Sequence, residues 1–177
     1  VSSYHKALDI NPGFAEAHYN LGAAQKDLGR TDEAVASYYR ALAINPDFTD
    51  AHYNLGSAQE ELGRIDEAVA SYHKALVIKP DYAEVWNNLG NALNEQGKLD
   101  DAVASYHKAL AIKPDYAEVW NNLGNALKEL GKLDDAVSSY HKALDINPGF
   151  AEAHYNLGVV QKDLGRTDEA VASYYRA

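Results

Sequence analysis

Apolar residues recur along this chain at spacings of three and four, the pattern of helices that bury one side. Trp120, Leu123, Gly124 and Leu127 form one such stripe, and a second stripe begins shortly afterwards at Ala136. Few residues separate the two stripes. We therefore expect two helices that pack as antiparallel neighbours.

The same pair of predicted helices returns every 34 residues. The period is clearest in a Leu-Gly step, at Leu21-Gly22, Leu55-Gly56, Leu89-Gly90, Leu123-Gly124 and Leu157-Gly158. Such a period indicates a stacked array, in which each unit buries its apolar face against its neighbours. With Leu-Gly at the seventh and eighth positions, the array divides into a partial unit with only a second helix (1–14), four complete units (15–48, 49–82, 83–116, 117–150) and a truncated unit (151–177).

Residues with the same period predict where the helices begin and end. Each first helix is expected to end at a glycine such as Gly29, in the left-handed conformation that glycine tolerates. Each second helix is expected to begin near an aspartate such as Asp32, whose carboxylate would cap free amides. It should end at Asn45-Pro46.

Composition narrows the classes of function. The chain of 177 residues has a formal net charge of −10 and contains no cysteine or methionine. The lack of cysteine excludes disulfides and thiolate chemistry, and the acidic balance argues against a nucleic-acid partner, because phosphate binding needs clustered Lys and Arg. No apolar run reaches the ~20 residues of a membrane helix, and no signal peptide opens the chain. We expect no membrane partner, and a cytoplasmic location is favoured.

The repeated motif resembles the tetratricopeptide repeat (TPR). The likeness is carried by Trp120-x-x-Leu123-Gly124, followed by Ala136, Tyr140, Ala143 and Pro148. It covers the whole chain, and five units agree. The resemblance implies an all-α fold, a right-handed α-solenoid superhelix of 34-residue antiparallel helix-turn-helix repeats. It also implies that the first helices line a concave groove.

Two positions depart from the family pattern. Histidine replaces the tryptophan in three units, at His18, His52 and His154. The usual downstream aromatic residue of the first helix is replaced at Gln25, Gln59, Leu93, Leu127 and Gln161. We expect the fold to tolerate both changes, with looser or more polar packing between helices.

A row of asparagines suggests where a ligand could bind. Position 6 is asparagine in every unit, at Asn20, Asn54, Asn88, Asn122 and Asn156. At about 100° per residue this position lies opposite the apolar stripe, and stacked helices would set the amides about 10 Å apart. Their donors and acceptors could hold the main chain of an extended peptide. The alternative is that each amide bonds to its own helix or to a neighbouring loop.

The asparagine row also resembles a ladder in the superhelical region of O-linked N-acetylglucosamine transferase, where it holds substrate polypeptide. That resemblance implies that the five position-6 amides line a peptide-binding groove. It also implies that further asparagines thicken the ladder in the middle units and tyrosines replace them elsewhere. These additional residues are Asn87, Asn91, Asn121, Asn125, Tyr19, Tyr53 and Tyr155.

Charge restricts the peptides that such a groove would accept. The chaperone-tail clamp of other family members needs Lys or Arg at inward positions, whereas position 2 is acidic here, as in Glu84 and Glu118. We therefore expect a neutral or basic segment whose binding weakens with salt. The acids could equally serve the helix dipole.

The sequence contains no pattern typical of a catalytic, metal or cofactor site. Its seven histidines recur one repeat apart or replace tryptophan, so they predict no shared zinc site. Acid pairs such as Asp100-Asp101 open helices and are explained by capping. Phosphate-binding glycine loops and Ser-His-acid patterns are absent. We expect no metal, no cofactor and no enzymatic activity in this chain.

The sequence therefore predicts a scaffold that binds an extended polypeptide. One alternative is a substrate-presenting arm of a larger enzyme, such as a glycosyltransferase. Another is a self-assembling structural array. Residues 137–177 match residues 1–41 except at Ala23/Val159 and Ala24/Val160. The array looks like a piece without polar end caps, so end-to-end association is also expected.

Overall fold

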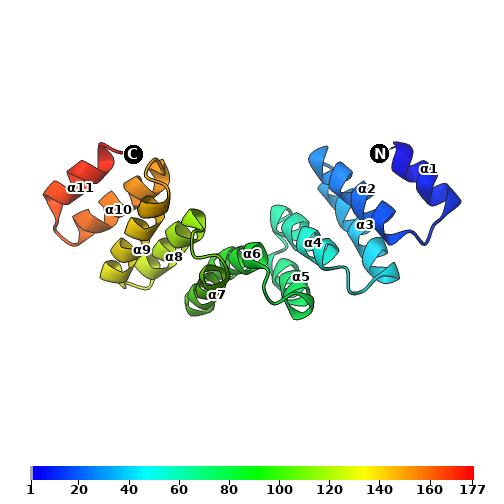
Figure 1. The fold of residues 1–177 in the computed structure, drawn as a ribbon, viewed down its shortest axis with the longest axis horizontal. Helices are drawn as coiled ribbons and strands as arrows, with labels where there is room; N and C mark the ends of the chain where they lie inside the picture. Colours follow the sequence, from blue (N-terminus) through cyan, green and yellow to red (C-terminus); the bar gives the residue numbers. More distant parts are fainter. Residues whose placement is uncertain (1) are drawn as a thin grey trace. The chain divides into compact units, whose positions relative to one another are not determined.

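A computed structural model describes residues 2–177, with all side chains in this range except those of residues 2, 3 and 5. Residue 1 of the predicted partial unit therefore lies outside the described residues. Regular structure in the described range is entirely helical (Figure 1). The helices are α1 (Ser2–Ile10), α2 (Ala15–Asp27), α3 (Thr31–Ile44), α4 (Thr49–Glu61), α5 (Ile65–Ile78), α6 (Ala83–Glu95), α7 (Leu99–Ile112), α8 (Ala117–Glu129), α9 (Leu133–Ile146), α10 (Ala151–Asp163) and α11 (Thr167–Tyr174). The predicted all-α class is confirmed.

From α2 onward the helices alternate between two kinds. We call α2, α4, α6, α8 and α10 the A helices, and α3, α5, α7, α9 and α11 the B helices. Each A helix has 13 residues and is followed by a glycine with φ between 71° and 74°. At Gly63, for example, the next amide, on Arg64, turns back to the carbonyl of Gln59 at 2.8 Å. The glycine ends of the A helices are as predicted.

The start of each B helix differs from the prediction. The aspartate lies inside the first turn, as Asp32 does in α3, and the residue at the N-cap is Arg30, without a side-chain cap. Asp32 instead pairs with Arg64 of the next repeat at 2.7 Å. The predicted capping role of the aspartates was therefore wrong. A carboxylate in the first turn still interacts favourably with the helix dipole.

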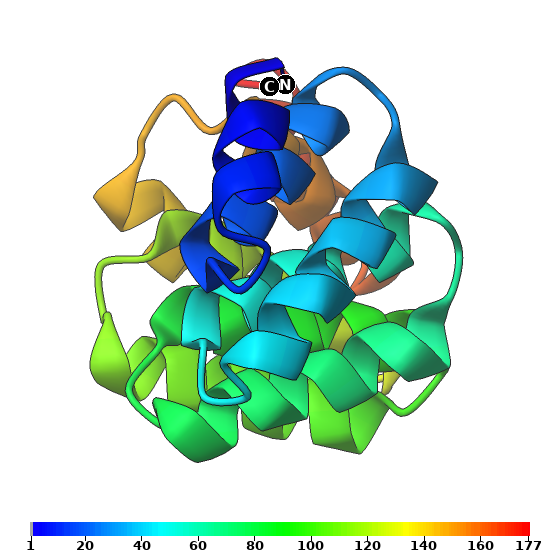
Figure 2. The same cartoon turned by 90° about the vertical axis from the view of Figure 1, so that its right-hand side faces the viewer.

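The chain divides into two compact units, one ending at Ala92 and the other beginning at Leu93. From α1 to α5 in the first unit, and from α7 to α11 in the second, successive helices pack against each other in chain order. Figure 2 shows the first unit from the side of α1, which lies in front. Consecutive A helices also contact each other directly, α2 with α4 and α8 with α10. Among the described residues, α3 and α5 make no such contact, nor do α9 and α11. The A helices thus form the more closely packed layer in each unit.

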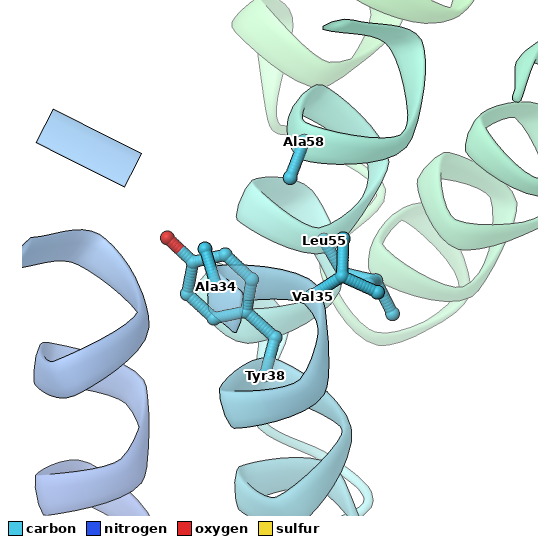
Figure 3. Close-up of a cluster of buried hydrophobic side chains, with 5 residues drawn as sticks. All are labelled: Ala34, Val35, Tyr38, Leu55 and Ala58. Atoms are coloured by element: carbon cyan, nitrogen blue, oxygen red, sulfur yellow. The ribbon is translucent and has the colours of Figure 1, made fainter. Parts of the chain in front are cut away.

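Small residues and tyrosines fill the space between the layers. Ala34, Val35 and Tyr38 of α3 and Leu55 and Ala58 of α4 form one buried cluster, shown in Figure 3. Alanine at a helix contact lets two backbones approach, and the tyrosine ring spans the remaining gap. The cluster joins one repeat to the next, as expected of an array that buries its core between neighbours.

Candidate functional site

The asparagine row lies along the seam between consecutive A helices. The Nδ2 of Asn54 donates a hydrogen bond to the hydroxyl of Tyr19 at 2.8 Å. In the same register Asn88 donates to Tyr53 at 3.3 Å. Each bond therefore connects position 6 of one repeat with position 5 of the preceding repeat. In both bonds the acceptor lies in the preceding repeat.

The second unit repeats this connection with a different acceptor. Asn156 donates to the side-chain oxygen of Asn121 at 3.1 Å, and Asn121 donates in turn to Glu152 at 3.0 Å. Asn121 is only 1% exposed. Its donor and acceptor are both used between α8 and α10, so this amide positions the neighbouring side chains rather than facing solvent.

The position-6 amides differ in exposure along the chain. Asn20 is exposed, while Asn54, Asn88 and Asn122 are half-buried. Asn156 is 9% exposed. An asparagine side chain has two N–H donors and one acceptor oxygen. The bond from Asn54 to Tyr19 uses one donor, so the half-buried amide of Asn54 keeps a second N–H and its oxygen for a ligand.

The additional asparagines of the predicted groove are only partly accessible. Asn87 is buried and donates to Asn88 at 3.2 Å. Asn91 and Asn125 are half-buried. The oxygen of Asn125 accepts a bond from Tyr140 at 2.7 Å, which leaves its N–H groups for other partners.

The tyrosines at position 5 pack with aromatic rings that precede the next A helix. Tyr19 lies 4.8 Å from Phe48, and Tyr53 lies 5.5 Å from Tyr82, between ring centroids. Burial raises the pKa of Tyr19 and Tyr53, so both hydroxyls stay protonated at neutral pH. Tyr155 is 57% exposed. Tyr19 and Tyr53 therefore pack between consecutive A helices, and their hydroxyls fix the orientation of Asn54 and Asn88.

Carboxylates flank the asparagine row. At position 2, Glu118 is exposed and Glu84 is half-buried. Asp50 accepts a bond from the hydroxyl of Tyr82 at 3.4 Å. Burial, with the charge of Asp50 next in importance, raises the pKa of Tyr82 to about 12. The A-helix surface thus combines amides with negative charge. We call this surface of each unit its A face; it consists of Asn20, Asn54, Asn88 and Glu84 in the first unit, and of Asn122, Asn156 and Glu118 in the second.

Histidine and tryptophan at position 4 make the same contact. The ring nitrogen Nε2 of His52 lies 2.8 Å from the carbonyl oxygen of Pro46, six residues earlier. The indole Nε1 of Trp120 donates to the carbonyl of Pro114 at 2.9 Å. An imidazole therefore replaces an indole without loss of this bond, which explains why the fold tolerates the departure from the family pattern.

A second hydrogen-bond network distinguishes two kinds of repeat, those with histidine at position 4 (His-type) and those with tryptophan there (Trp-type). In the His-type pairs α2–α3, α4–α5 and α10–α11, a buried glutamine joins a serine and a glutamate of the B helix. Gln59, for example, accepts from Ser71 at 2.6 Å and donates to Glu67 at 3.2 Å. In the Trp-type pair α8–α9 a leucine replaces the glutamine, and Ser139 bonds the carbonyl of Asp135 instead. This network was not predicted from the sequence. The signal was present, because His, Gln and Glu occur together in the same three repeats.

Neither a metal centre nor a membrane span is found among the described residues. Within that part of the chain, no three His, Cys, Asp or Glu side chains are grouped to hold a metal ion. None of the helices described has the length and hydropathy needed to cross a bilayer.

The stacked helix pairs define a helical-repeat protein. A family model described as "TPR repeat" matches residues 1–29, 26–63, 61–97, 90–131 and 124–165. The chain belongs to the tetratricopeptide repeat family, whose members are in general protein-interaction scaffolds without enzymatic activity.

Solved structures share this fold. A crystal structure of MamA is 27% identical, with a TM-score of 0.84, and the match covers 88% of this chain and 91% of that one. PilF of Pseudomonas aeruginosa is 25% identical, with a TM-score of 0.82, and the match covers 92% and 74%. YrrB, described as a TPR protein with an unusual peptide-binding site, is 23% identical, with a TM-score of 0.83 and coverage of 98% and 89%. No curated protein matches the sequence.

Proposed function

We propose that this chain binds an extended segment of a partner polypeptide along the A face. The observation that carries the proposal is the row of asparagines at the seams between A helices. Asn54 and Asn88 are held in place by Tyr19 and Tyr53, and both amides stay partly exposed. Such pre-positioned amides bind a main chain at low entropic cost.

The surrounding charge favours a neutral or basic segment. Each unit has an acidic residue on its A face, Glu84 half-buried in the first and Glu118 exposed in the second, and the chain has a net charge of −10. Attraction between exposed charges falls within about 10 Å at 0.1 M salt. Binding of a basic peptide should therefore weaken as salt is raised, while the contacts to its main chain persist.

The same surface offers no group suited to catalysis. It presents amides, carboxylates and phenolic hydroxyls, and the tyrosines are kept protonated by burial. These groups suit a binding module, and YrrB, which has the same fold, is described as a TPR protein with an unusual peptide-binding site. A role as the arm of a larger enzyme would use the same surface.

The experiment is a selection of peptides from a displayed random library against the intact chain, followed by affinity measurements on variants. Asn20 is the cleanest probe: it is exposed, and no side-chain bond holds it within the described part of the chain. Asn20→Ala should weaken binding of peptides that reach α2 without changing the melting temperature. Asn147→Ala is the matched control, because this amide lies at the end of α9, where it accepts from the backbone of Gly149.

Asn54→Ala tests the centre of the row. It should weaken binding and also lower stability, since it removes the bond to Tyr19. If the selected peptides bind Asn20→Ala, Asn54→Ala and Asn88→Ala as tightly as the unchanged chain, the A face is not the binding surface.

A further inference from the structure

Two open cavities lie on the B-helix side, away from the A face. One, of about 590 Å³, lies between α3 and α5 and has His52 and Gln59 of α4 at its floor. The other, of about 750 Å³, lies between α9 and α11 and has His154 and Gln161 of α10 at its floor. Both belong to His-type repeats. We call them the B clefts.

The Trp-type repeats have a larger ring at the position of the histidine. His52 and Trp120 occupy equivalent positions, and both ring nitrogens contact a proline carbonyl six residues earlier. His52 is 7% exposed, whereas Trp120 is half-buried. Indole is larger than imidazole by one fused six-membered ring. We infer that the B clefts at His52 and His154 are the space that the extra ring of an indole would occupy.

The lining suits an aromatic group with a hydrogen-bond donor. Leu42 of α3 and Ala70 and Ile78 of α5 supply apolar walls. Glu67 also lines the cleft, and one of its carboxylate oxygens accepts from Gln59. A carboxylate has two acceptor oxygens, so the second one is available for a donor on a ligand. Glu169 has the same relation to Gln161 in the other B cleft.

We propose that each B cleft binds an aromatic side chain with an N–H or O–H donor, tryptophan or tyrosine, presented by a partner polypeptide. The ring lies over the imidazole of His52 or His154, between consecutive B helices. Its donor bonds to Glu67 or Glu169. This surface is separate from the A face and does not depend on peptide binding there.

The probe for the test is N-acetyl-tryptophanamide, titrated into the chain while the imidazole signals of His52 and His154 are followed by NMR. We expect saturable shifts of both signals. N-acetyl-alaninamide should shift neither, because it has no ring. N-acetyl-phenylalaninamide should bind about 2- to 10-fold more weakly than the tryptophan compound, the value of one hydrogen bond. Equal binding of the two aromatic amides would overturn the role of Glu67 and Glu169.

Two reciprocal variants test the location. His52→Trp should close the first B cleft and abolish the response of α4, while His154 still responds. The triple change Trp120→His, Leu127→Gln and Asp135→Glu should open a new cleft between α7 and α9 and add a response around α8. Circular dichroism checks that both variants are folded.

Three results would contradict the proposal or the explanation given for it. Absence of saturable shifts at His52 and His154 would overturn the proposal. So would a folded His52→Trp variant in which backbone signals of α4 still shift as before. A triple variant that is folded but gains no response would show that the missing indole ring does not define the site. Peptide binding at the A face should be the same in all of these variants.

Discussion

The ring of Tyr72 in α5 lies against the backbone of Gly56 in α4, where a Cβ atom would come within 2.6 Å of the ring carbon Cε1. Because bonded neighbours fix both residues, Gly56→Ala must displace the ring or separate the two helices. Overpacking of this kind typically costs ~1–3 kcal/mol. We expect a loss of that size in the free energy of unfolding, measured with urea.

Gly63 provides the contrasting case. It has φ of 71° and no heavy atom within 4 Å of its would-be Cβ. Gly63→Ala should therefore destabilise through backbone strain alone, by roughly 1–2 kcal/mol. Combining each change with Tyr72→Leu distinguishes the two mechanisms. Gly56→Ala should be partly rescued by the smaller side chain, and Gly63→Ala should be additive with it. If Tyr72→Leu rescued both glycine variants, backbone strain would not be the cause of the loss at Gly63.

Features that are local in sequence were predictable, and those that depend on stacking were not. The glycine at position 63 indicated a helix end, because left-handed backbone is a local property. The acceptor of Asn54 is Tyr19, in the preceding repeat. Which residues meet across that seam depends on how one helix pair lies on the next. The sequence predicted a polar row there but could not identify its partners.

The serines of the B helices donate hydrogen bonds to different kinds of acceptor. Ser71 donates to the oxygen of Gln59, a residue only 1% exposed. Ser105 donates to the carbonyl of Asp101 in its own helix. Ser71→Ala should therefore leave a buried amide oxygen unpaired and cost ~1–3 kcal/mol. Ser105→Ala, equally buried, leaves a helical carbonyl and should cost little. Equal losses in urea denaturation would contradict this difference.

Protonation of His52 should weaken the fold. Burial lowers the pKa of His52 below its ordinary value of 6.5, and Lys74 acts in the same direction. Below pH 6.5 the unfolded chain therefore takes up this proton more readily than the folded chain. Stability should fall as the pH drops from 6.5 toward the lower folded pKa. His52→Trp keeps a donor to Pro46 and does not titrate. Its free energy of unfolding should thus fall less between pH 7.5 and pH 5.5 than that of the unchanged chain; a parallel decline would show that other groups cause the loss.

The helix pair α2–α3 contacts the next helix, α4, through residues that recur in the last helix pair, α10–α11. Lys26 donates to Ser57 at 2.6 Å, and Tyr19 accepts from Asn54; residues 151–177 repeat residues 15–41 except at two positions. Tyr155, the counterpart of Tyr19, is 57% exposed. We therefore expect the 177-residue polypeptide to associate as its concentration rises, through an open contact that can propagate.

Sedimentation velocity of the unchanged polypeptide and of a Tyr155→Asp variant measures this association. The substitution places a charge where an apolar ring would be covered, and it should shift association to higher concentration. Ala104→Asp, on the exposed surface of α7, is the control and should change nothing. A single monomeric species for the unchanged polypeptide, across a wide range of concentration, would rule out association through this surface. Association that Tyr155→Asp leaves unaltered would locate the contact elsewhere on the molecule.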